Sequence, residues 1–142
     1  MLTARERHAA LVEAMVADGT LTDTALIDAF RSVPRHRFIP ETGALTAYGA
    51  SLNANNNPEQ WLAAVYADNA IVTQVDESTV AARGEPPAYQ EVGSQARREA
   101  ATSSSSAPTV LARLFELADL ANGQRVLEVG TGSGYITACL AR

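Results

Sequence analysis

The stretch that decides the fold reads Arg125-Val126-Leu127-Glu128-Val129-Gly130-Thr131-Gly132-Ser133-Gly134-Tyr135. A short apolar run rich in β-branched residues stops at three glycines spaced two apart, and an apolar helical pattern follows. This pattern predicts a strand at 125–129, a glycine turn and a helix. The glycines allow positive φ angles and remove the Cβ atoms that would keep a flat ligand off the turn. We therefore predict a ligand site here.

The charge beside the turn favours one kind of ligand. A dinucleotide fingerprint has the spacing G-x-G-x-x-G and places pyrophosphate at a helix N-terminus. This chain has G-x-G-x-G, with Glu128 two residues before Gly130. A carboxylate there repels a pyrophosphate but suits a ligand with an ammonium and a sulfonium group, so the spacing favours S-adenosylmethionine over NAD. The segment Glu128–Gly134 resembles the first motif of the class I methyltransferases; the alternative is a turn that closes a βα unit without a ligand.

Composition excludes several function classes. The 142 residues, 46% of them hydrophobic, suffice for one domain and one core. All 11 basic residues are Arg, and the net charge of −5 argues against a general nucleic-acid binder. Cys139 is the only cysteine, which excludes an intramolecular disulfide and a zinc site built on several thiolates. We predict no metal site, no export or membrane segment, and a cytoplasmic location.

The N-terminal part reads as helical. Apolar periodicity predicts a helix over residues 4–17 and a second over residues 23–32, with Thr22 as its N-cap and Pro34 closing it. The segment 33–40 that follows is too irregular for a regular element. Its His36 lies between two arginines with no acid or nucleophile nearby in sequence, so we interpret it as a structural or surface residue rather than a catalytic one.

The middle of the chain alternates loops with short elements. We predict a loop over 41–57, a short helix from Pro58 capped by Asn57, and a strand over 70–75. The polar segment 76–102 predicts a long mobile loop or a partly disordered insertion.

Four serines precede the next helix. Residues 103–106 are typical of a flexible linker, yet Pro108 fits a helix N1 position and an apolar face follows. That predicted face consists of Leu111, Leu114, Phe115 and Ala118. Ser106 would then lie near a helix N-terminus, where a hydroxyl can meet a carboxylate.

Together these segments resemble the protein-L-isoaspartate O-methyltransferase family. The matching stretches are Leu26–Pro40 with its Val-Pro-Arg-His-x-Phe-Ile-Pro, the Ser106-Ala-Pro that opens a helix, and Val126–Arg142. The sequence departs from the family at the serine, where a compact Gly-Gln-Thr-Ile-Ser type loop is usual. Placing the motif serine at Ser106 rather than Ser105 rests on the Ala-Pro that follows. Residues 61–76 and the serine run are also similar to a bacterial branch that acts on aspartates of ribosomally made precursor peptides.

The resemblance implies a mechanism and site residues. The enzyme would transfer a methyl group from S-adenosylmethionine to the carboxylate of an L-isoaspartyl residue in a protein or peptide. Ser106 would hydrogen-bond near that carboxylate without forming a covalent intermediate. Residues 130–134, namely Gly130, Thr131, Gly132, Ser133 and Gly134, would form the cofactor turn, with Glu128 organising the amino-acid end of the cofactor. The acceptor is already ionised at neutral pH, so no strong base is needed.

These readings give an α/β fold in three parts. Residues 1–75 form a helical, substrate-side segment, and residues 76–105 form a flexible polar loop or insertion. Residues 106–142 are the start of a Rossmann-like cofactor domain whose sheet is incomplete. We expect these residues to be the N-terminal part of a longer monomeric enzyme, which alone would bind cofactor weakly or not at all and be inactive. Two other classes stay open: an oxidoreductase-type nucleotide binder and a non-catalytic interaction module.

Overall fold

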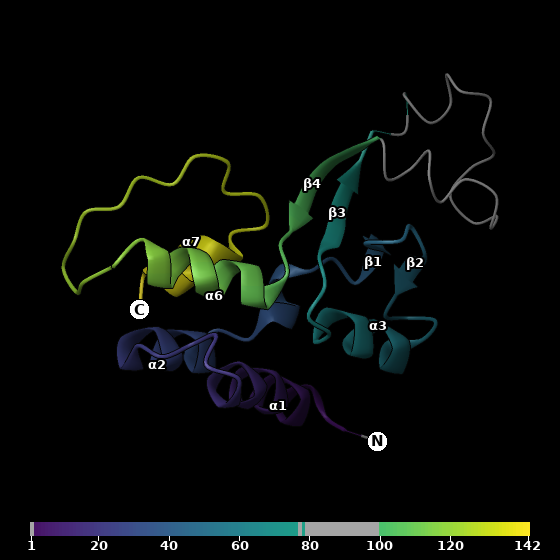
Figure 1. The fold of residues 1–142 in the computed structure, drawn as a ribbon. Helices are drawn as coiled ribbons and strands as arrows, with labels where there is room; N and C mark the ends of the chain where they lie inside the picture. Colours follow the sequence, from purple (N-terminus) through teal and green to yellow (C-terminus); the bar gives the residue numbers. More distant parts are fainter. Residues whose placement is uncertain (1, 77, 79–99) are drawn as a thin grey trace.

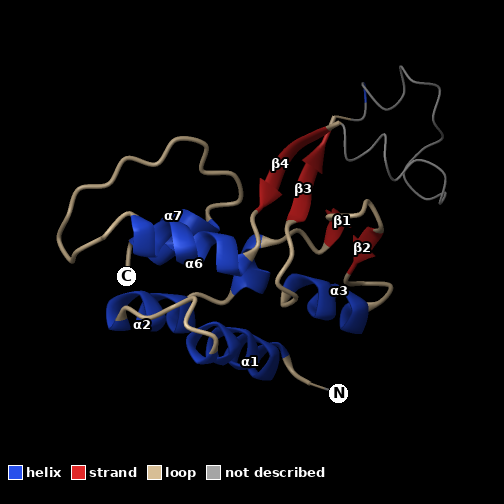
Figure 2. Cartoon of the chain, in the orientation of Figure 1, coloured by secondary structure: helices blue, strands red, loops and turns tan. Residues whose placement is uncertain are grey.

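The computed structural model describes residues 2–76, 78 and 100–142. Helices α1, α2, α6 and α7 gather on one side of the molecule, and the strands lie with α3 on the other (Figure 1). The elements are α1 (Ala4–Ala17), α2 (Thr24–Ser32), the 3-10 helix η1 (Arg35–Phe38), β1 (Thr42–Thr46), β2 (Ser51–Asn53), α3 (Pro58–Val65), β3 (Ile71–Val75), β4 (Ala101–Ser105), α6 (Pro108–Leu117) and α7 (Tyr135–Leu140). Both element types contribute substantially (Figure 2), which confirms a mixed α/β fold.

Local caps fix the first two helices. A capping box starts α1: the Thr3 side chain accepts from the Glu6 amide at 3.2 Å, and Glu6 accepts from the Thr3 amide at 2.8 Å. The predicted N-cap of the second helix was wrong by one residue, since Asp23 caps α2 by accepting from the Leu26 amide. Thr22 is engaged elsewhere, because its amide donates to Glu116 of α6 at 2.6 Å.

The sheet is antiparallel, with strand order β2-β1-β3-β4. β1 and β2 correct the predicted loop over 41–57. They form because Ala44, Leu45 and Leu52 are buried. A tight turn joins the two strands, in which the Gly49 amide donates to the Thr46 carbonyl at 2.9 Å. The predictions of α3 with its Asn57 cap and of β3 are confirmed.

β4 also corrects the sequence reading. Ala101–Ser105, assigned to a flexible polar loop, pair with β3 as its antiparallel neighbour. The serine run is therefore the edge of a sheet rather than a linker. The rest of the predicted loop, residues 77 and 79–99, lies outside the described residues.

The segment 125–129 forms no strand and pairs with no strand of the described chain. The strand predicted at 125–129 is therefore wrong for this structure. Val126, Leu127 and Val129 are 49%, 87% and 88% exposed, so the described chain leaves most of this apolar surface uncovered, whereas a strand of a parallel sheet is buried. The helix predicted after the glycines is confirmed as α7.

Two apolar clusters hold these elements in place. One joins α1, α2, α6 and α7 and includes the Phe30 ring 5.9 Å from Phe115 and 6.4 Å from Tyr135. The other lies between α3 and the sheet, around Trp61 and Ile71. The predicted face of α6 is corrected, because Leu114 and Ala118 are exposed. The helix buries Pro108, Leu111, Ala112 and Phe115 instead. In the described ranges no helix has the length and apolar character needed to cross a membrane.

Candidate functional site

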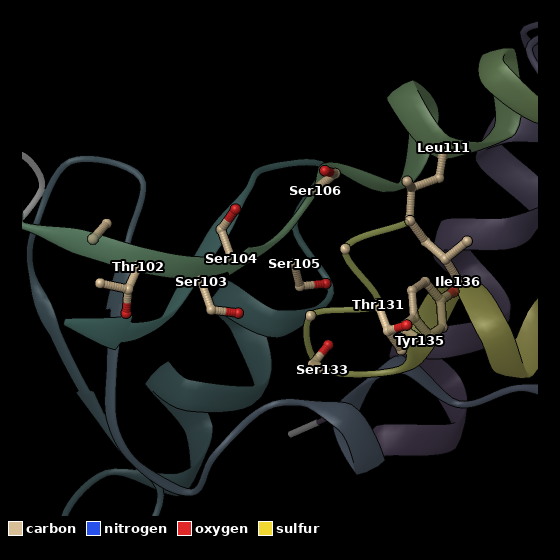
Figure 3. A pocket seen from close by; sticks show the side chains of 13 residues that line it. Thr102, Ser103, Ser104, Ser105, Ser106, Leu111, Thr131, Ser133, Tyr135 and Ile136 are labelled. Atoms are coloured by element: carbon tan, nitrogen blue, oxygen red, sulfur yellow. The ribbon is translucent and has the colours of Figure 1, made fainter. Parts of the chain in front are cut away.

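A cavity of about 450 Å³ lies between β4 and the glycine turn (Figure 3). One wall is the edge of the sheet, the other is the turn, and the first residues of α7 with Leu111 of α6 close the end. The lining residues are Ala101, Thr102, Ser103, Ser104, Ser105, Ser106, Leu111, Gly130, Thr131, Gly132, Ser133, Tyr135 and Ile136. Two segments that are separate in sequence thus face each other across one space.

The strand wall carries a row of hydroxyl groups. Ser103 and Ser105 extend to the side of β4 on which Ser133 lies, and Ser104 and Ser106 extend to the other (Figure 3). Thr73 of β3 donates its hydroxyl hydrogen to the Ser103 hydroxyl oxygen at 3.0 Å, which orients that side chain. Ser105 is buried, whereas Ser106 is only partly buried.

The turn wall is formed by glycines in the left-handed region. Gly130, Gly132 and Gly134 have φ angles of 82°, 55° and 84°, a conformation that L side chains rarely adopt, which confirms the predicted need for glycine. A Cβ on Gly132 would lie 3.5 Å from the Ser104 carbonyl oxygen and 3.7 Å from the Ser103 hydroxyl oxygen. Glycine thus keeps this approach between the two walls free of side-chain atoms.

Most of the predicted site residues meet at this cavity. Ser106, Gly130, Thr131, Gly132 and Ser133 all line it, while Glu128 and Gly134 do not. Their roles remain predictions.

Glu128 lies just before the turn and reaches α7. The Thr137 hydroxyl donates to Glu128 Oε2, whereas Oε1 is buried without a hydrogen-bond partner among the described residues. Burying a carboxylate oxygen without a hydrogen-bond donor costs free energy. A ligand that donates a hydrogen bond to this oxygen would remove that cost.

His36 contacts the core rather than the cavity. Its Nδ1 is hydrogen-bonded to the Tyr66 hydroxyl, and burial, followed by the Arg37 charge, lowers the pKa of His36 below its ordinary value. Burial raises the pKa of Tyr66. Since His36 does not line the cavity, the geometry agrees with its interpretation as a structural residue.

Sequence reasoning missed Arg35, the neighbour of His36. Arg35 is fully buried, and its guanidinium donates to backbone carbonyls, including those of Ser105 at 3.3 Å and Ser106 at 3.0 Å. Burial lowers the pKa of Arg35 to about 10, so the group remains charged at neutral pH. An arginine between two prolines, beside apolar residues, is the only sequence signal for it.

The lining limits what chemistry the cavity can perform. Its side chains are hydroxyls, small groups and apolar groups, with no carboxylate, imidazole, thiol or amine among the lining residues. Burial raises the pKa of Tyr135, so its hydroxyl stays protonated. Such a site can bind and orient polar ligands through hydroxyl and peptide groups, but it offers no strong base at neutral pH.

Comparison with known proteins assigns the class. The sequence profile of the family described as Protein-L-isoaspartate(D-aspartate) O-methyltransferase (PCMT) matches residues 69–142, more than half of the chain and including both walls of the cavity. The glycine turn and the serine wall both lie within the matched residues. The chain belongs to the protein-L-isoaspartate O-methyltransferase family.

Individual relatives carry the same name. The Opitutus terrae protein-L-isoaspartate O-methyltransferase is 30% identical over 131 residues, covering 92% of this chain and 37% of the relative. The Methylorubrum extorquens protein of that name is 28% identical over 137 residues, covering 96% and 41%. One from Anaeromyxobacter dehalogenans is 62% identical over 37 residues, covering 26% and 18%. The chain thus spans about two fifths of the length of the first two relatives.

Proposed function

We propose that this protein transfers a methyl group from S-adenosylmethionine to the carboxylate of L-isoaspartyl residues in proteins or peptides. The observation that carries the proposal is the cavity that Ser106 and the glycine turn both line, in a chain of this family. The names of the relatives supply the substrate class.

The residues of the turn fit the cofactor. Gly132 leaves open a space that a Cβ would narrow, and Glu128 Oε1 is a buried acceptor without a donor among the described residues. Gly130, Thr131, Gly132, Ser133 and Gly134 would hold the cofactor against the backbone, and Glu128 would accept a hydrogen bond from its amino-acid end. S-adenosylmethionine supplies the methyl group when it is bound there.

The strand wall fits the acceptor. A carboxylate is ionised at neutral pH and needs no base to become a nucleophile, which agrees with a lining that contains none. Ser106 would donate its hydroxyl hydrogen to the substrate carboxylate and fix its direction. Catalysis then rests on alignment of the reacting groups, which contributes up to about 7 to 11 kcal/mol in well-oriented reactions.

The test is methyl transfer by the native gene product, with tritiated S-adenosylmethionine and two synthetic peptides that differ only in an isoaspartyl or an aspartyl linkage. We expect label in a base-labile ester, released as volatile methanol, with the isoaspartyl peptide alone. Transfer to the aspartyl peptide instead would favour a dedicated precursor peptide as substrate. Absence of transfer to both would contradict the proposal.

Ser106→Ala and Ser105→Ala separate the two candidate serines in the same assay. We expect the Ser106→Ala variant to lose at least about tenfold in transfer rate, because a hydrogen bond to a charged group contributes about 1.5 to 3 kcal/mol. Ser105→Ala is the matched control within the same wall. The reverse order of effects would move the motif serine to Ser105.

A further inference from the structure

The proposed function assigns no role to Arg35. We propose that Arg35 is a positioning residue: its guanidinium fixes the backbone of Ser105 and Ser106, and hence the Ser106 hydroxyl, against the turn that follows α3. The inference rests on the proposed function for its catalytic meaning, and on contacts of Arg35 for its structural basis.

The guanidinium bridges two backbone segments that are far apart in sequence. Toward the turn after α3, Arg35 Nη1 donates to the Val65 carbonyl at 2.7 Å, and Nη2 donates to the Asn69 carbonyl at 2.9 Å. Toward the cavity, Nη2 donates to the Ser106 carbonyl at 3.0 Å and to the Ser105 carbonyl at 3.3 Å. One planar group thus sets the spacing between the two segments.

Ser106 needs such support because regular structure does not hold it. The ladder between β3 and β4 ends at the pair Ile71 and Ser105, and α6 begins at Pro108. Ser106 lies in the gap, where neither strand pairing nor helical hydrogen bonds fix the backbone. The contact from Arg35 to its carbonyl falls in this gap.

A second contact fixes the far end of the same gap to the same turn. Asp68 accepts from the Thr109 amide at 3.0 Å and from the Thr109 hydroxyl at 2.6 Å, near the start of α6. The turn after α3 therefore holds Thr109 through Asp68, while Arg35 holds Ser106 to that turn. Together these contacts define where the serine enters the cavity.

Only arginine suits this arrangement. Its donors lie in a rigid plane and can reach acceptors on opposite sides at once, whereas a lysine ammonium is a compact point charge with three donors. Arg37, two residues later in η1, is exposed, so it provides a matched control for the loss of an arginine.

The first test follows the backbone in the ligand-free chain by NMR. Arg35→Lys is expected to shift the Ser105, Ser106 and Ala107 backbone resonances and to speed amide exchange there, with Arg37→Lys leaving them unchanged. Unchanged resonances in a folded Arg35→Lys variant would overturn the proposal. This result does not depend on any ligand, so it stands even if the proposed function fails.

The second test separates positioning from general stability through two affinities. Arg35→Lys should weaken binding of an isoaspartyl peptide at least about tenfold, or 1.4 kcal/mol, while S-adenosylhomocysteine affinity at the glycine turn changes less than about twofold. Equal loss of both affinities would show a merely structural role and overturn the proposal. Absence of binding by the wild type to both ligands would instead count against the proposed function.

Where Arg35→Lys does not fold, the wild type still decides the question. We expect the Arg35 guanidinium protons to be individually resolved, slow in exchange with water, and close enough to the Ser106 backbone to give cross-relaxation. Guanidinium protons that exchange as fast as those of Arg37 would overturn the inference.

Discussion

Two stretches of similar composition behave differently in this molecule. Ile71–Val75 and Arg125–Val129 are both five residues long, rich in β-branched and aliphatic side chains, and bounded by turn residues. The first is strand β3, paired on both sides with β1 and β4. The second forms no strand and pairs with no strand of the described chain, and its Leu127 and Val129 are almost fully exposed.

The difference shows that strand propensity is realised through partners. Side-chain preference for a pleated surface contributes little until neighbouring strands and a covering layer are present. β3 has α3 and the core around Ile71, whereas the apolar side chains of 125–129 face solvent. The glycine turn after that segment is nevertheless in place, because its conformation is local and α7 packs into the helical cluster.

Truncation of one side chain in each stretch should give the largest contrast. Ile71→Ala removes a buried side chain and should lower the free energy of unfolding by about 2 to 5 kcal/mol. Val129→Ala, in the exposed stretch, should change it by less than about 0.5 kcal/mol. Urea denaturation followed by circular dichroism measures both, and equal costs would mean that 125–129 is packed in solution.

A smaller effect is expected from two glycines with positive φ that flank the unpaired stretch. Gly132→Ala and Gly123→Ala should each destabilise the chain by about 1 to 2 kcal/mol, since both force alanine into the left-handed region. Only Gly132→Ala places a methyl group toward Ser103 and Ser104. It alone should weaken S-adenosylhomocysteine binding, by about tenfold or more.

An equal loss of affinity in the Gly123→Ala variant would show that backbone strain, rather than the space beside Gly132, governs binding. Calorimetric titration of the two variants side by side makes this distinction.

Removal of one hydroxyl group beside each stretch tests whether a hydrogen bond in the packed sheet contributes more to stability than one in the exposed stretch. Thr73→Val removes the bond to Ser103 inside the sheet and should cost about 1 kcal/mol. Thr137→Val removes the bond to Glu128, which lies in the unpaired and mostly exposed stretch 125–129, so the cost should stay below about 0.5 kcal/mol. A larger cost for Thr137→Val would indicate that the segment around Glu128 is held more firmly than its exposure implies.

The smallest expected effect is a dependence on pH at the contact between His36 of η1 and Tyr66. Burial lowers the pKa of His36 in the folded state, so the folded protein binds its proton less readily than the unfolded chain. The contribution of neutral His36 to the free energy of unfolding is complete above its ordinary pKa of 6.5 and is lost as the pH falls below that value. His36→Gln should flatten the slope of unfolding free energy between about pH 7 and 5, and an unchanged slope would exclude His36 as its source.

Local signals account for most of what the sequence predicted correctly. The Asn57 cap and the helices that begin at Pro58 and Pro108 depend on neighbours within a few residues. Such local signals can be recognised in the sequence. The same holds for the glycines with positive φ. β1 and β2 were missed because their short, glycine-containing pattern becomes a pair of strands only through burial against α3.

Distant contacts account for the rest. Ser106 and the glycine turn were assigned to one site only through the family resemblance, and the structure places both on one cavity. Arg35 was missed because its acceptors lie 30 to 71 residues away in sequence, and no local pattern encodes a guanidinium held by carbonyls. The strand predicted at 125–129 was wrong for the same physical reason. A strand forms only beside a partner strand, and the local sequence does not show whether that partner is present.

The central claim is that β4 and the glycine turn are two walls of one binding site. Titration of the isotope-labelled native gene product with S-adenosylhomocysteine, followed by amide chemical shifts, tests it most directly. We predict that residues 130–133 and residues 103–106 shift together and fit a single dissociation constant. Shifts confined to one of the two walls, or absent from both, would contradict the account.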